Sequence, residues 1–362
     1  MEIPAAKSPI ESMDGRGRTE RQPGPAGPRL GFAGLGWIGA QRMQVLAGLD
    51  LAEVVAVCDP RQEALDKACA PLLRKPACCQ SFDDLLAQPL DGVVIATPNA
   101  LHELQSVAAM ERGLAVFSQK PLALSQQGTE RLLALARKKN LPLGIDWSYR
   151  YLAGVPELKQ RIRSGELGTI TAAELCFHNA YGPHAPWYYD LSRAGGGCLL
   201  DLGCHLLDLC HWLIGARDPR DLTARCFRNG ERLRPPLDKP EDFVMAQIDY
   251  ASGQHVHMSC SWRASAGCGA IIGCRIFGTD GGAEIRNVNG SFYDFEVALN
   301  HGAESTLLGA PPDAWPGRAL IDWTNRVRSG DGWDAEVAHV ATTAEVIDRI
   351  YNRDVRESQL CA

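Results

Sequence analysis

Short apolar segments alternate with longer amphipathic segments between residues 29 and 151 of the chain. The short segments are apolar at successive positions, which predicts strands that are buried on both faces. We place these strands at 29–33, 53–60, 91–98, 114–121 and 141–151. We place helices after the first strand and at 61–73, 81–88, 99–113 and 125–140. This alternation predicts an α/β domain, a doubly wound parallel sheet with helices on both of its faces.

The pattern changes after about residue 150, where strand-like segments dominate. A predicted helix at 155–168 is followed by segments in which apolar and polar residues often alternate, as in strands with one buried face. These segments are 170–181, 221–230, 243–251, 254–262, 274–285 and 291–299, and residues 331–354 return to a helical pattern. We therefore predict a disordered leader at 1–28, the α/β domain at 29–148, and an α+β domain with a mostly antiparallel sheet at 149–362.

Two stripes of residues run side by side in the segment LLDLGCHLLDLC, residues 199–210. One stripe is apolar and continues to Leu213, whereas the other carries Asp201, His205 and Asp208. If the segment is a helix, Asp201 and His205 are one turn apart and face the same way. The three glycines at 195–197 cannot stabilise a helix interior, so we predict a close-packed turn that delivers the helix into a cleft.

A glycine-rich turn joins the first strand to the first helix. Its sequence is GLGWIG, with Gly34, Gly36, Trp37, Ile38 and Gly39. The three glycines suit a tight turn, close approach of the backbone to a pyrophosphate, and close packing of helix on strand. The N-terminus of the helix then offers free N–H groups to the phosphates. A glycine turn that binds nothing is the structural alternative.

Acidic and basic side chains follow the second predicted strand. Asp59 ends that strand, and a carboxylate at this place accepts the hydroxyls of an adenosine ribose, which favours NAD. Arg61 lies two residues further on and could cover a 2′-phosphate, so NADP stays possible. After the third long strand, Thr97, Pro98 and Asn99 are predicted to face the dinucleotide. Asn99 can equally cap the next helix, and His102 is a cofactor candidate with a structural alternative.

Composition excludes several classes of protein. The chain has 362 residues, 43 of them acidic and 37 basic, and its net charge of −6 includes no basic cluster that would bind nucleic acid. The 13 cysteines form no CxxC pair, which indicates reduced thiols, a cytoplasmic protein and no metal site. No apolar run reaches the length of about 18 residues that a membrane span needs, so we predict no membrane association.

Four motifs together resemble the Gfo/Idh/MocA oxidoreductases, over about residues 29–355. They are GLGWIG, TPNALH (97–102), QKPLA (119–123) and GGGCLLDLGCHLLD (195–208). The resemblance implies a Rossmann domain, a second domain with a large open and mostly antiparallel sheet, bound NAD or NADP, and substrates that are sugars or cyclitols. The family motif EKP reads Gln119-Lys120-Pro121 here. Gln119 keeps an acceptor but loses the charge that lies near the cofactor in relatives.

The catalytic assignment follows from the chemistry of alcohol oxidation, in which hydride and proton leave together. His205 is the predicted acid/base, because an imidazole titrates near neutrality. Lys120 is predicted to donate to the reacting oxygen and to stabilise the alkoxide. Asp201 would orient the imidazole or bind a neighbouring hydroxyl of the substrate. The alternative is that Asp201 and His205 form a satisfied pair between domains without chemistry, and for Asp208 we favour packing or hydrogen bonding.

Further substrate contacts are predicted at the domain boundary and in an aromatic loop. Tyr149 and Arg150 end the last strand of the first domain, and Arg150 suits a structural role equally well. In the loop YGPHAPWYYD, Trp187, Tyr188 or His184 could stack on a sugar ring, and we select Trp187. His255 and His257 share one face of a strand but have no third ligand, so we assign them to the sheet surface.

We predict an NAD(P)-dependent dehydrogenase that acts on a secondary alcohol of a sugar, cyclitol or related polyol. Three alternatives remain open: a redox-neutral enzyme that oxidises a glycoside, cleaves it and returns the hydride; a non-catalytic NAD(P)-binding regulator; and an NADPH-dependent reductase. We also expect a homo-oligomer, a dimer or tetramer, because relatives often are and because an open sheet has a face that can pair.

Overall fold

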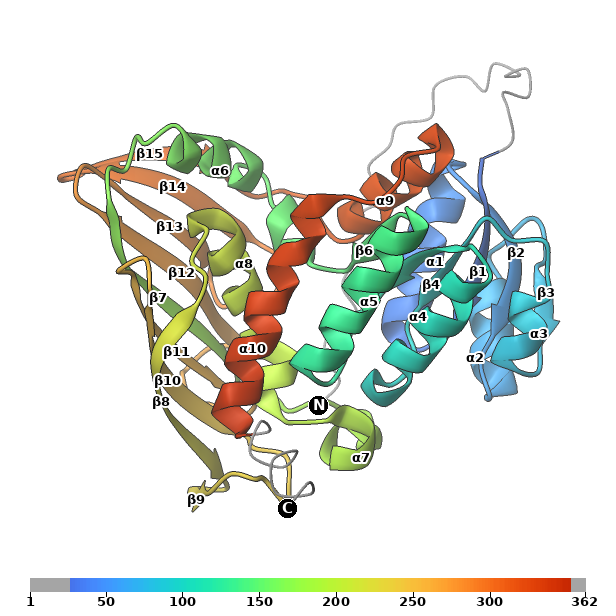
Figure 1. The fold of residues 1–362 in the computed structure, drawn as a ribbon, viewed down its shortest axis with the longest axis horizontal. Coiled ribbons are helices and arrows are strands. Elements are labelled where there is room, and N and C mark those ends of the chain that lie inside the picture. Colours follow the sequence, from blue (N-terminus) through green and yellow to red (C-terminus); the bar gives the residue numbers. More distant parts are fainter. Residues whose placement is uncertain (1–26, 353–362) are drawn as a thin grey trace.

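Six short strands form a parallel sheet in the computed structural model, which describes residues 27–352 (Figure 1). The strands are β1 (Arg29–Ala33), β2 (Glu53–Cys58), β3 (Ala77–Cys79), β4 (Gly92–Ile95), β5 (Ala115–Ser118) and β6 (Leu143–Ile145). Their order is β3-β2-β1-β4-β5-β6 and every pairing is parallel, the arrangement of a doubly wound nucleotide-binding sheet. The predicted α/β fold is confirmed.

Helices cover this sheet on both faces, as expected for strands that are apolar throughout. They are α1 (Trp37–Leu49), α2 (Gln62–Cys69), α3 (Phe82–Leu86), α4 (His102–Glu111) and α5 (Gln126–Lys139). Ser81 caps α3, since its hydroxyl accepts from the backbone N–H of Asp84 and the Asp84 carboxylate accepts from the backbone N–H of Ser81. The last predicted strand was too long, because β6 stops at Ile145 and residues Ser148–Tyr151 form a 3-10 turn.

A second sheet of nine strands forms the other half of the molecule (Figure 1). The strands are β7 (Ile170–Asn179), β8 (Pro219–Arg228), β9 (Glu231–Leu233), β10 (Phe243–Tyr250), β11 (His255–Ser261), β12 (Ala270–Gly278), β13 (Gly282–Asn287), β14 (Phe295–His301) and β15 (Glu304–Gly309). The order is β15-β14-β13-β12-β7-β11-β10-β8-β9, and only β7 and β11 pair in parallel. The segment 274–285, predicted as one strand, is instead a hairpin of β12 and β13.

Helices of the second half line one face of the large sheet and leave the other uncovered (Figure 1). They are α6 (Val155–Arg163), α8 (Cys204–Ile214) and α10 (Val340–Tyr351), whereas the short α7 (Leu191–Ala194) contacts the 3-10 turn at Asn99–Leu101 of the first domain. Helix α10 contacts both α8 and α5, so these helices join the two sheets. One helical stretch, Leu191–Ile214, is long and apolar enough to cross a membrane by length and composition, but 78% of its apolar window is buried inside the protein. It is a core element here.

Helix α9 (Arg318–Ser329) returns from the second sheet to the first. Its buried Leu320 and Trp323 belong to the same apolar cluster as Phe32 and Phe117 of the parallel sheet. The rings of Trp323 and Phe117 have centroids 5.7 Å apart. A segment that comes late in the sequence therefore completes the covering of the nucleotide-binding half. The leader predicted at 1–28 lies almost wholly outside the described residues.

Candidate functional site

The glycine turn between β1 and α1 has the geometry that a dinucleotide pyrophosphate requires. Gly34 has φ +83°, and a Cβ there would lie 2.4 Å from the Ala96 carbonyl oxygen. A Cβ on Gly39 would lie 2.0 Å from the Gly34 oxygen, so the start of α1 lies too close to the end of β1 for any residue larger than glycine. A Cβ on Gly36 would meet only Arg61, at 4.0 Å. No side chain caps α1 and its first turn has no acidic residue, which leaves its N–H groups available to phosphate.

Asp59 and Arg61 form a pair at the end of β2. The Asp59 carboxylate accepts from the backbone N–H of Leu35 at 2.7 Å, and from the Arg61 backbone N–H at 3.0 Å and Nε at 3.2 Å. Burial raises the pKa of Asp59, but the hydrogen bonds and the charge of Arg61 together lower it by more. The pKa is therefore below its usual value, and the carboxyl is ionised. The Arg61 side chain is 65% exposed. Arg61 therefore lies beside the glycine turn and pairs with the Asp59 carboxylate.

The TPN segment after β4 mostly serves to hold the loop. Asn99 is buried and donates from Nδ2 to the Ala194 carbonyl at 2.9 Å, which ties the first domain to the residue before the three glycines. His102 is fully buried, with Nδ1 2.7 Å from the Pro121 oxygen and Nε2 2.8 Å from the Thr97 oxygen. Since both ring nitrogens are engaged, His102 has no surface for the cofactor contact that we predicted. It ties the segment after β4, at Thr97, to the chain just after Lys120, at Pro121.

Lys120 and Asp201 meet across the two domains. Lys120 follows β5, and its Nζ lies 3.0 Å from Asp201 Oδ1 and 2.5 Å from the Asp201 carbonyl oxygen. The other carboxylate oxygen, Oδ2, accepts from Trp262 Nε1 at 2.9 Å. Burial lowers the pKa of Lys120, but the Asp201 carboxylate, together with Cys204 and Tyr188, raises it by more in total, so the ammonium is held in its charged form. Lys120 and Asp201 keep side-chain exposures of 16% and 15%, so both remain within reach of a ligand.

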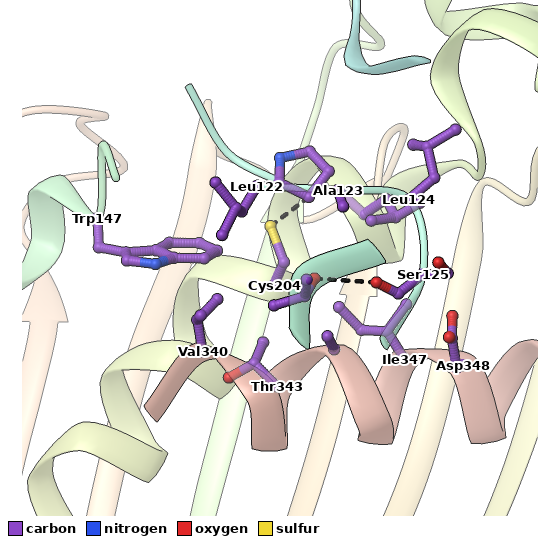
Figure 2. Close-up of a pocket in the computed structure, with 14 residues that line it drawn as sticks. Leu122, Ala123, Leu124, Ser125, Trp147, Cys204, Val340, Thr343, Ile347 and Asp348 are labelled. Carbon is purple, nitrogen blue, oxygen red and sulfur yellow. Dashed lines mark hydrogen bonds between the residues drawn. The ribbon is translucent and has the colours of Figure 1, made fainter. Parts of the chain in front are cut away.

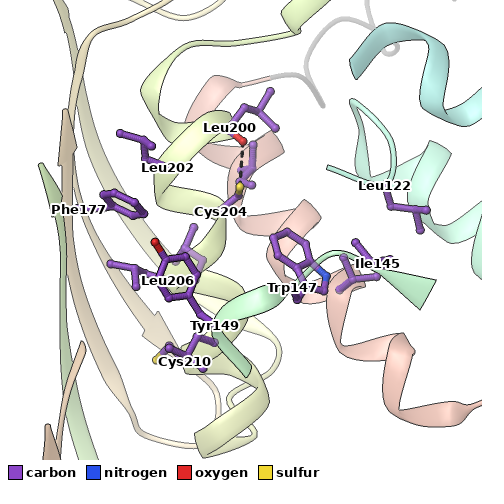
Figure 3. Close-up of a cluster of buried hydrophobic side chains, with 14 of the residues drawn as sticks. Leu122, Ile145, Trp147, Tyr149, Phe177, Leu200, Leu202, Cys204, Leu206 and Cys210 are labelled. Atoms are coloured by element: carbon purple, nitrogen blue, oxygen red, sulfur yellow. Dashed lines mark hydrogen bonds between the residues drawn. The ribbon is translucent and has the colours of Figure 1, made fainter. Parts of the chain in front are cut away.

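Asp201 does not lie on the regular α-helix that carries His205 and Asp208. Residues Leu199–Gly203 form a π-helical turn that precedes α8, and the Cys204 backbone N–H donates to the Leu199 oxygen, five residues back, and to the Leu202 oxygen. The Leu200 oxygen accepts from the Cys204 thiol at 2.9 Å, as Figure 3 shows. A π turn widens the helix and is common at functional sites. The structure thus places Asp201 toward Lys120 and Trp262, not as a hydrogen-bond partner of His205.

The glycine run is held by a buried carboxylate. Glu241, which precedes β10 and is fully buried, accepts from the backbone N–H groups of Gly197 and Leu199, each at 2.9 Å. Its carboxylate also accepts from the Tyr351 hydroxyl at 2.8 Å. A Cβ on Gly197 would lie 1.8 Å from the Glu241 backbone oxygen. The prediction of a close-packed glycine turn is confirmed, and Glu241 fixes where the π turn begins.

His205 lies in an aromatic enclosure beside this pair. Its ring centroid is 5.1 Å from that of Tyr149, 5.8 Å from Trp147 and 6.4 Å from Phe177. Figure 3 shows Trp147 and Tyr149 on either side of the start of α8. Within residues 27–352, the buried Nδ1 of His205 has no hydrogen-bond partner. Burial, followed by the charges of Lys120 and Arg42, holds the pKa of His205 well below 6.5, so the imidazole is neutral and able to accept a proton.

Aromatic side chains of the loop at 181–190 border the same place. Trp187, our selected residue, stacks on Tyr188 with centroids 3.9 Å apart. Burial raises the pKa of Tyr188, and the charges of Asp201 and Lys120 act on it as well. Tyr188 is therefore close enough to Lys120 and Asp201 for their charges to act on its hydroxyl, whereas Trp187 contacts the ring of Tyr188 by stacking.

Arg150 and Asp208 form a buried bidentate ion pair. Arg150 Nε is 2.7 Å from Asp208 Oδ2 and Nη2 is 2.5 Å from Oδ1. Burial raises the pKa of Asp208, and Arg150 opposes that rise. This geometry supports the packing or hydrogen-bonding role favoured for Asp208. Arg150 Nε and Nη2 already donate to Asp208, so these two donors do not point toward a substrate.

A small cavity lies behind the site, between the chain that follows Lys120 and helix α10 (Figure 2). Leu122, Trp147, Cys204 and Thr343 are among the residues that line it. Its volume of about 20 Å³ suits a water molecule rather than a sugar ring. Among the residues that the structure describes, no three His, Cys, Asp or Glu side chains gather as metal ligands, and all twelve described cysteines are free.

Several residues of the site were not selected from the sequence. Trp262 directly follows β11 and reaches Asp201 only because β11 pairs with β7 inside the second sheet, which a single sequence does not reveal. The sequence around Glu241 also has no pattern that marks this residue as part of the site. Asp146 could have been found, because it directly follows a buried strand as Asp59 does. It accepts from Gln119 Nε2 at 2.5 Å and from Arg42 Nε at 2.7 Å.

Two family models match the chain. Residues 29–146 match a model described as "Oxidoreductase family, NAD-binding Rossmann fold", and residues 155–284 match one described as "GFO/IDH/MocA C-terminal domain". The two matches cover the two sheets described above and together span most of the chain.

Individual relatives agree with these matches. D-apiose dehydrogenase of Paraburkholderia graminis is 25% identical over 290 residues, which are 80% of this chain and 74% of that protein. D-glucoside 3-dehydrogenase of Escherichia coli is 27% identical over 252 residues, 64% of this chain and 69% of that protein.

Solved structures share the fold over nearly the whole chain. Levoglucosan dehydrogenase, solved with NADH and levoglucosan, has a TM-score of 0.75 at 20% identity and covers 91% of this chain and 98% of its own. GenD2 from gentamicin A biosynthesis, solved with NAD, has a TM-score of 0.74 at 23% identity, covering 93% and 97%. With both of its domains matched, the chain belongs to the Gfo/Idh/MocA family of NAD-binding oxidoreductases.

Proposed function

We propose that this chain transfers a hydride between a secondary alcohol of a sugar, cyclitol or related polyol and a nicotinamide cofactor. One observation carries the proposal. Lys120, at the carboxyl end of a strand in the nucleotide-binding sheet, reaches Asp201 of the other domain at 3.0 Å, beside a neutral histidine. Ligands of doubly wound sheets bind beyond the carboxyl ends of the strands. The dehydrogenases among the relatives support the same reaction type.

The side chains divide the work of alcohol oxidation between them. A bound nicotinamide would supply the hydride acceptor. His205, neutral and buried at Nδ1, takes the hydroxyl proton through its other ring nitrogen, Nε2. Lys120 stays charged and donates to the oxygen as negative charge develops on it. Asp201, fixed by Trp262, holds the ammonium and can accept from a neighbouring substrate hydroxyl.

The test is a panel of sugars, cyclitols and glycosides with NAD and NADP, read by absorbance at the nicotinamide band and by product mass. We expect reduced cofactor in proportion to a product two hydrogens lighter than the substrate. Cofactor-dependent glycoside cleavage with no net reduced cofactor would assign the redox-neutral reaction instead. If no substrate turns over while the cofactor still binds, the chain is a binding protein and the proposal is wrong.

The acid limb of the pH profile should lie below that of an ordinary histidine. Because the pKa of His205 is well below 6.5, the base stays unprotonated until the pH falls through that lower value. We expect kcat/KM for oxidation to be level from about pH 6.5 upward and to decline only at lower pH. Lys120 has a raised pKa and adds no alkaline limb below its usual range. Initial rates in overlapping buffers measure this, and a midpoint near pH 7 would contradict it.

Removal of Arg61 should sharpen the choice of cofactor. The Arg61 side chain screens Asp59, which otherwise repels a 2′-phosphate. For Arg61→Ala we expect the Kd for NADP to rise about tenfold or more, with the Kd for NAD little changed, by fluorescence titration. Arg74, an exposed arginine 3.7 Å from Glu53, gives the matched control Arg74→Ala, which should alter neither value. Equal losses for both cofactors after Arg61→Ala would show that Arg61 does not select.

We also propose a homo-oligomer that pairs through the uncovered face of the large sheet. Met245 of β10 and Ile271 and Phe277 of β12 are 43%, 40% and 42% exposed, and they alternate with buried residues along their strands. Their outward position places them on the face that no helix covers (Figure 1). Light scattering after size exclusion should give a multiple of 39.3 kDa. A monomer at micromolar concentration would contradict this.

A further inference from the structure

Four side chains form a buried network next to Lys120 that the reaction above does not use. They are Arg42 of α1, Gln119 after β5, Asp146 after β6 and Ser148 in the following turn, with exposures of 4%, 8%, 2% and 5%. Asp146 Oδ2 accepts from Arg42 Nε at 2.7 Å and from Gln119 Nε2 at 2.5 Å. Its other oxygen accepts from the Ser148 hydroxyl, and Arg42 Nη2 donates to that hydroxyl at 3.2 Å.

The network fixes which way the Gln119 amide points. A carboxylate can only accept hydrogen bonds, so the amide nitrogen must face Asp146 and the amide oxygen must face away. In the described part of the chain, no donor is hydrogen-bonded to this oxygen. The backbone N–H of Gln119 bonds to the Ile95 oxygen at 2.8 Å, which keeps the residue in line with β5. Gln119 thus presents an uncharged acceptor at the carboxyl edge of the nucleotide-binding sheet, next to Lys120.

The network also fixes the charge at this edge. Arg42 and Asp146 neutralise one another at 2.7 Å, and Gln119 and Ser148 are uncharged. The negative charge in this network therefore belongs to Asp146, where Arg42 neutralises it, and not to residue 119 itself. Oxidised nicotinamide is positively charged and reduced nicotinamide is not, so an unpaired carboxylate nearby would favour the oxidised form. A neutral edge removes that preference.

We propose that Asp146 is a positioning residue that, through Arg42 and Gln119, orients a neutral acceptor toward the cofactor and sets the relative affinity for oxidised and reduced nicotinamide. The proposal rests on the cofactor binding of the proposed function, but it does not depend on turnover. Its measure is the ratio of two dissociation constants. Failure to oxidise any sugar would therefore leave this ratio testable, and an unaltered ratio would leave the assignment of Lys120 and His205 intact.

The experiment exchanges the two partners. In the double variant Gln119→Glu with Asp146→Asn, the new amide nitrogen at position 146 donates to the new carboxylate at position 119, with equal volumes and one carboxylate in total. In the parent chain Asp146 Oδ2 accepts from both Gln119 and Arg42, so in the variant Arg42 Nε faces an amide nitrogen. We therefore expect the double variant to melt below the parent chain but to fold. We expect the ratio of Kd for NAD to Kd for NADH to fall about tenfold, because the carboxylate now stands at residue 119. Gln119→Glu alone places two carboxylates against one arginine and should be less stable than the double variant.

A neutral variant separates orientation from charge. Gln119→Met keeps the length of the side chain but has no amide, so both cofactor forms should bind several-fold more weakly with their ratio unchanged. Fluorescence titration with NAD and NADH measures all variants, and Gln127→Glu on the exposed side of α5 is the charge control. An unchanged ratio in the folded double variant would overturn the proposal.

Discussion

Replacement of Lys120 by methionine is expected to lower kcat by a factor on the order of 100 to 1000, the usual cost of losing one donor to a developing oxyanion. Methionine keeps the length and apolar stem of the side chain but removes the ammonium that lies 3.0 Å from Asp201. The donor acts mainly on the transition state, so KM should change far less than kcat. The Kd for NAD, measured by titration, should stay within a few-fold of the parent value.

A matched lysine provides the control for this result. Lys139, in the last turn of α5, pairs with Glu111 at 2.6 Å on the exposed side of the first domain. Lys139→Met removes a lysine from an ion pair of the same kind, yet it should leave kcat unchanged because surface pairs contribute about 0–1 kcal/mol. If Lys120→Met kept kcat within a few-fold of the parent, Lys120 would not be the donor, and the proposed mechanism would lose its central group.

Replacement of Gly197 by alanine is expected to destabilise the protein by about 3 kcal/mol or more and to abolish activity. The added Cβ would lie 1.8 Å from the Glu241 backbone oxygen and 2.6 Å from its nitrogen. Both are backbone atoms, so no side chain can rotate to make room. The bond from the Cys198 N–H to the Glu241 oxygen, 2.9 Å long, holds the two segments at this spacing. Their separation would move the π turn and Asp201 with it.

Thermal unfolding and kcat together measure the effect of Gly197→Ala. The melting temperature should fall by at least about 5 °C. Gly48 in α1 gives the matched control, because a Cβ there has no neighbour within 4 Å. Gly48→Ala should be neutral or stabilising by up to about 1 kcal/mol, since alanine is the better helix former. A Gly197→Ala protein that melts within about 1 °C of the parent would contradict the close packing of Gly197 against Glu241.

The parallel sheet could be predicted from the sequence because its signal is local. Strands such as β4 and β5 are buried at every position and almost wholly apolar, and each is followed by a helix of ordinary period. The glycine turn was equally readable, since the positions of Gly34 and Gly39 follow from steric limits that any such turn shares. The short strands β3, β9 and β15 were missed, because three residues of which only one is buried, or an exposed edge strand, carry little hydrophobic pattern.

The sequence singled out Lys120, Asp201 and His205 but neither Trp262 nor Glu241, and it did not supply the contacts between them. We assumed a period of 3.6 residues for 199–210, and the π turn at Leu199–Gly203 changes the direction in which Asp201 points. Its partners, Lys120 and Trp262, lie 81 and 61 residues away in the chain, on a strand end and on another sheet. Contacts of that separation depend on the packing of two domains. Sequence periodicity describes only one element at a time, so it cannot supply them.

The return of α9 to the parallel sheet affects any attempt to divide the molecule. A fragment ending near residue 150 contains all six parallel strands and the glycine turn, yet it lacks Leu320 and Trp323. Phe117 and its apolar neighbours would then be exposed to water, and this exposed hydrophobic patch would promote aggregation of the fragment. A nucleotide-binding unit that can be produced separately would have to carry residues 318–329 spliced onto its end.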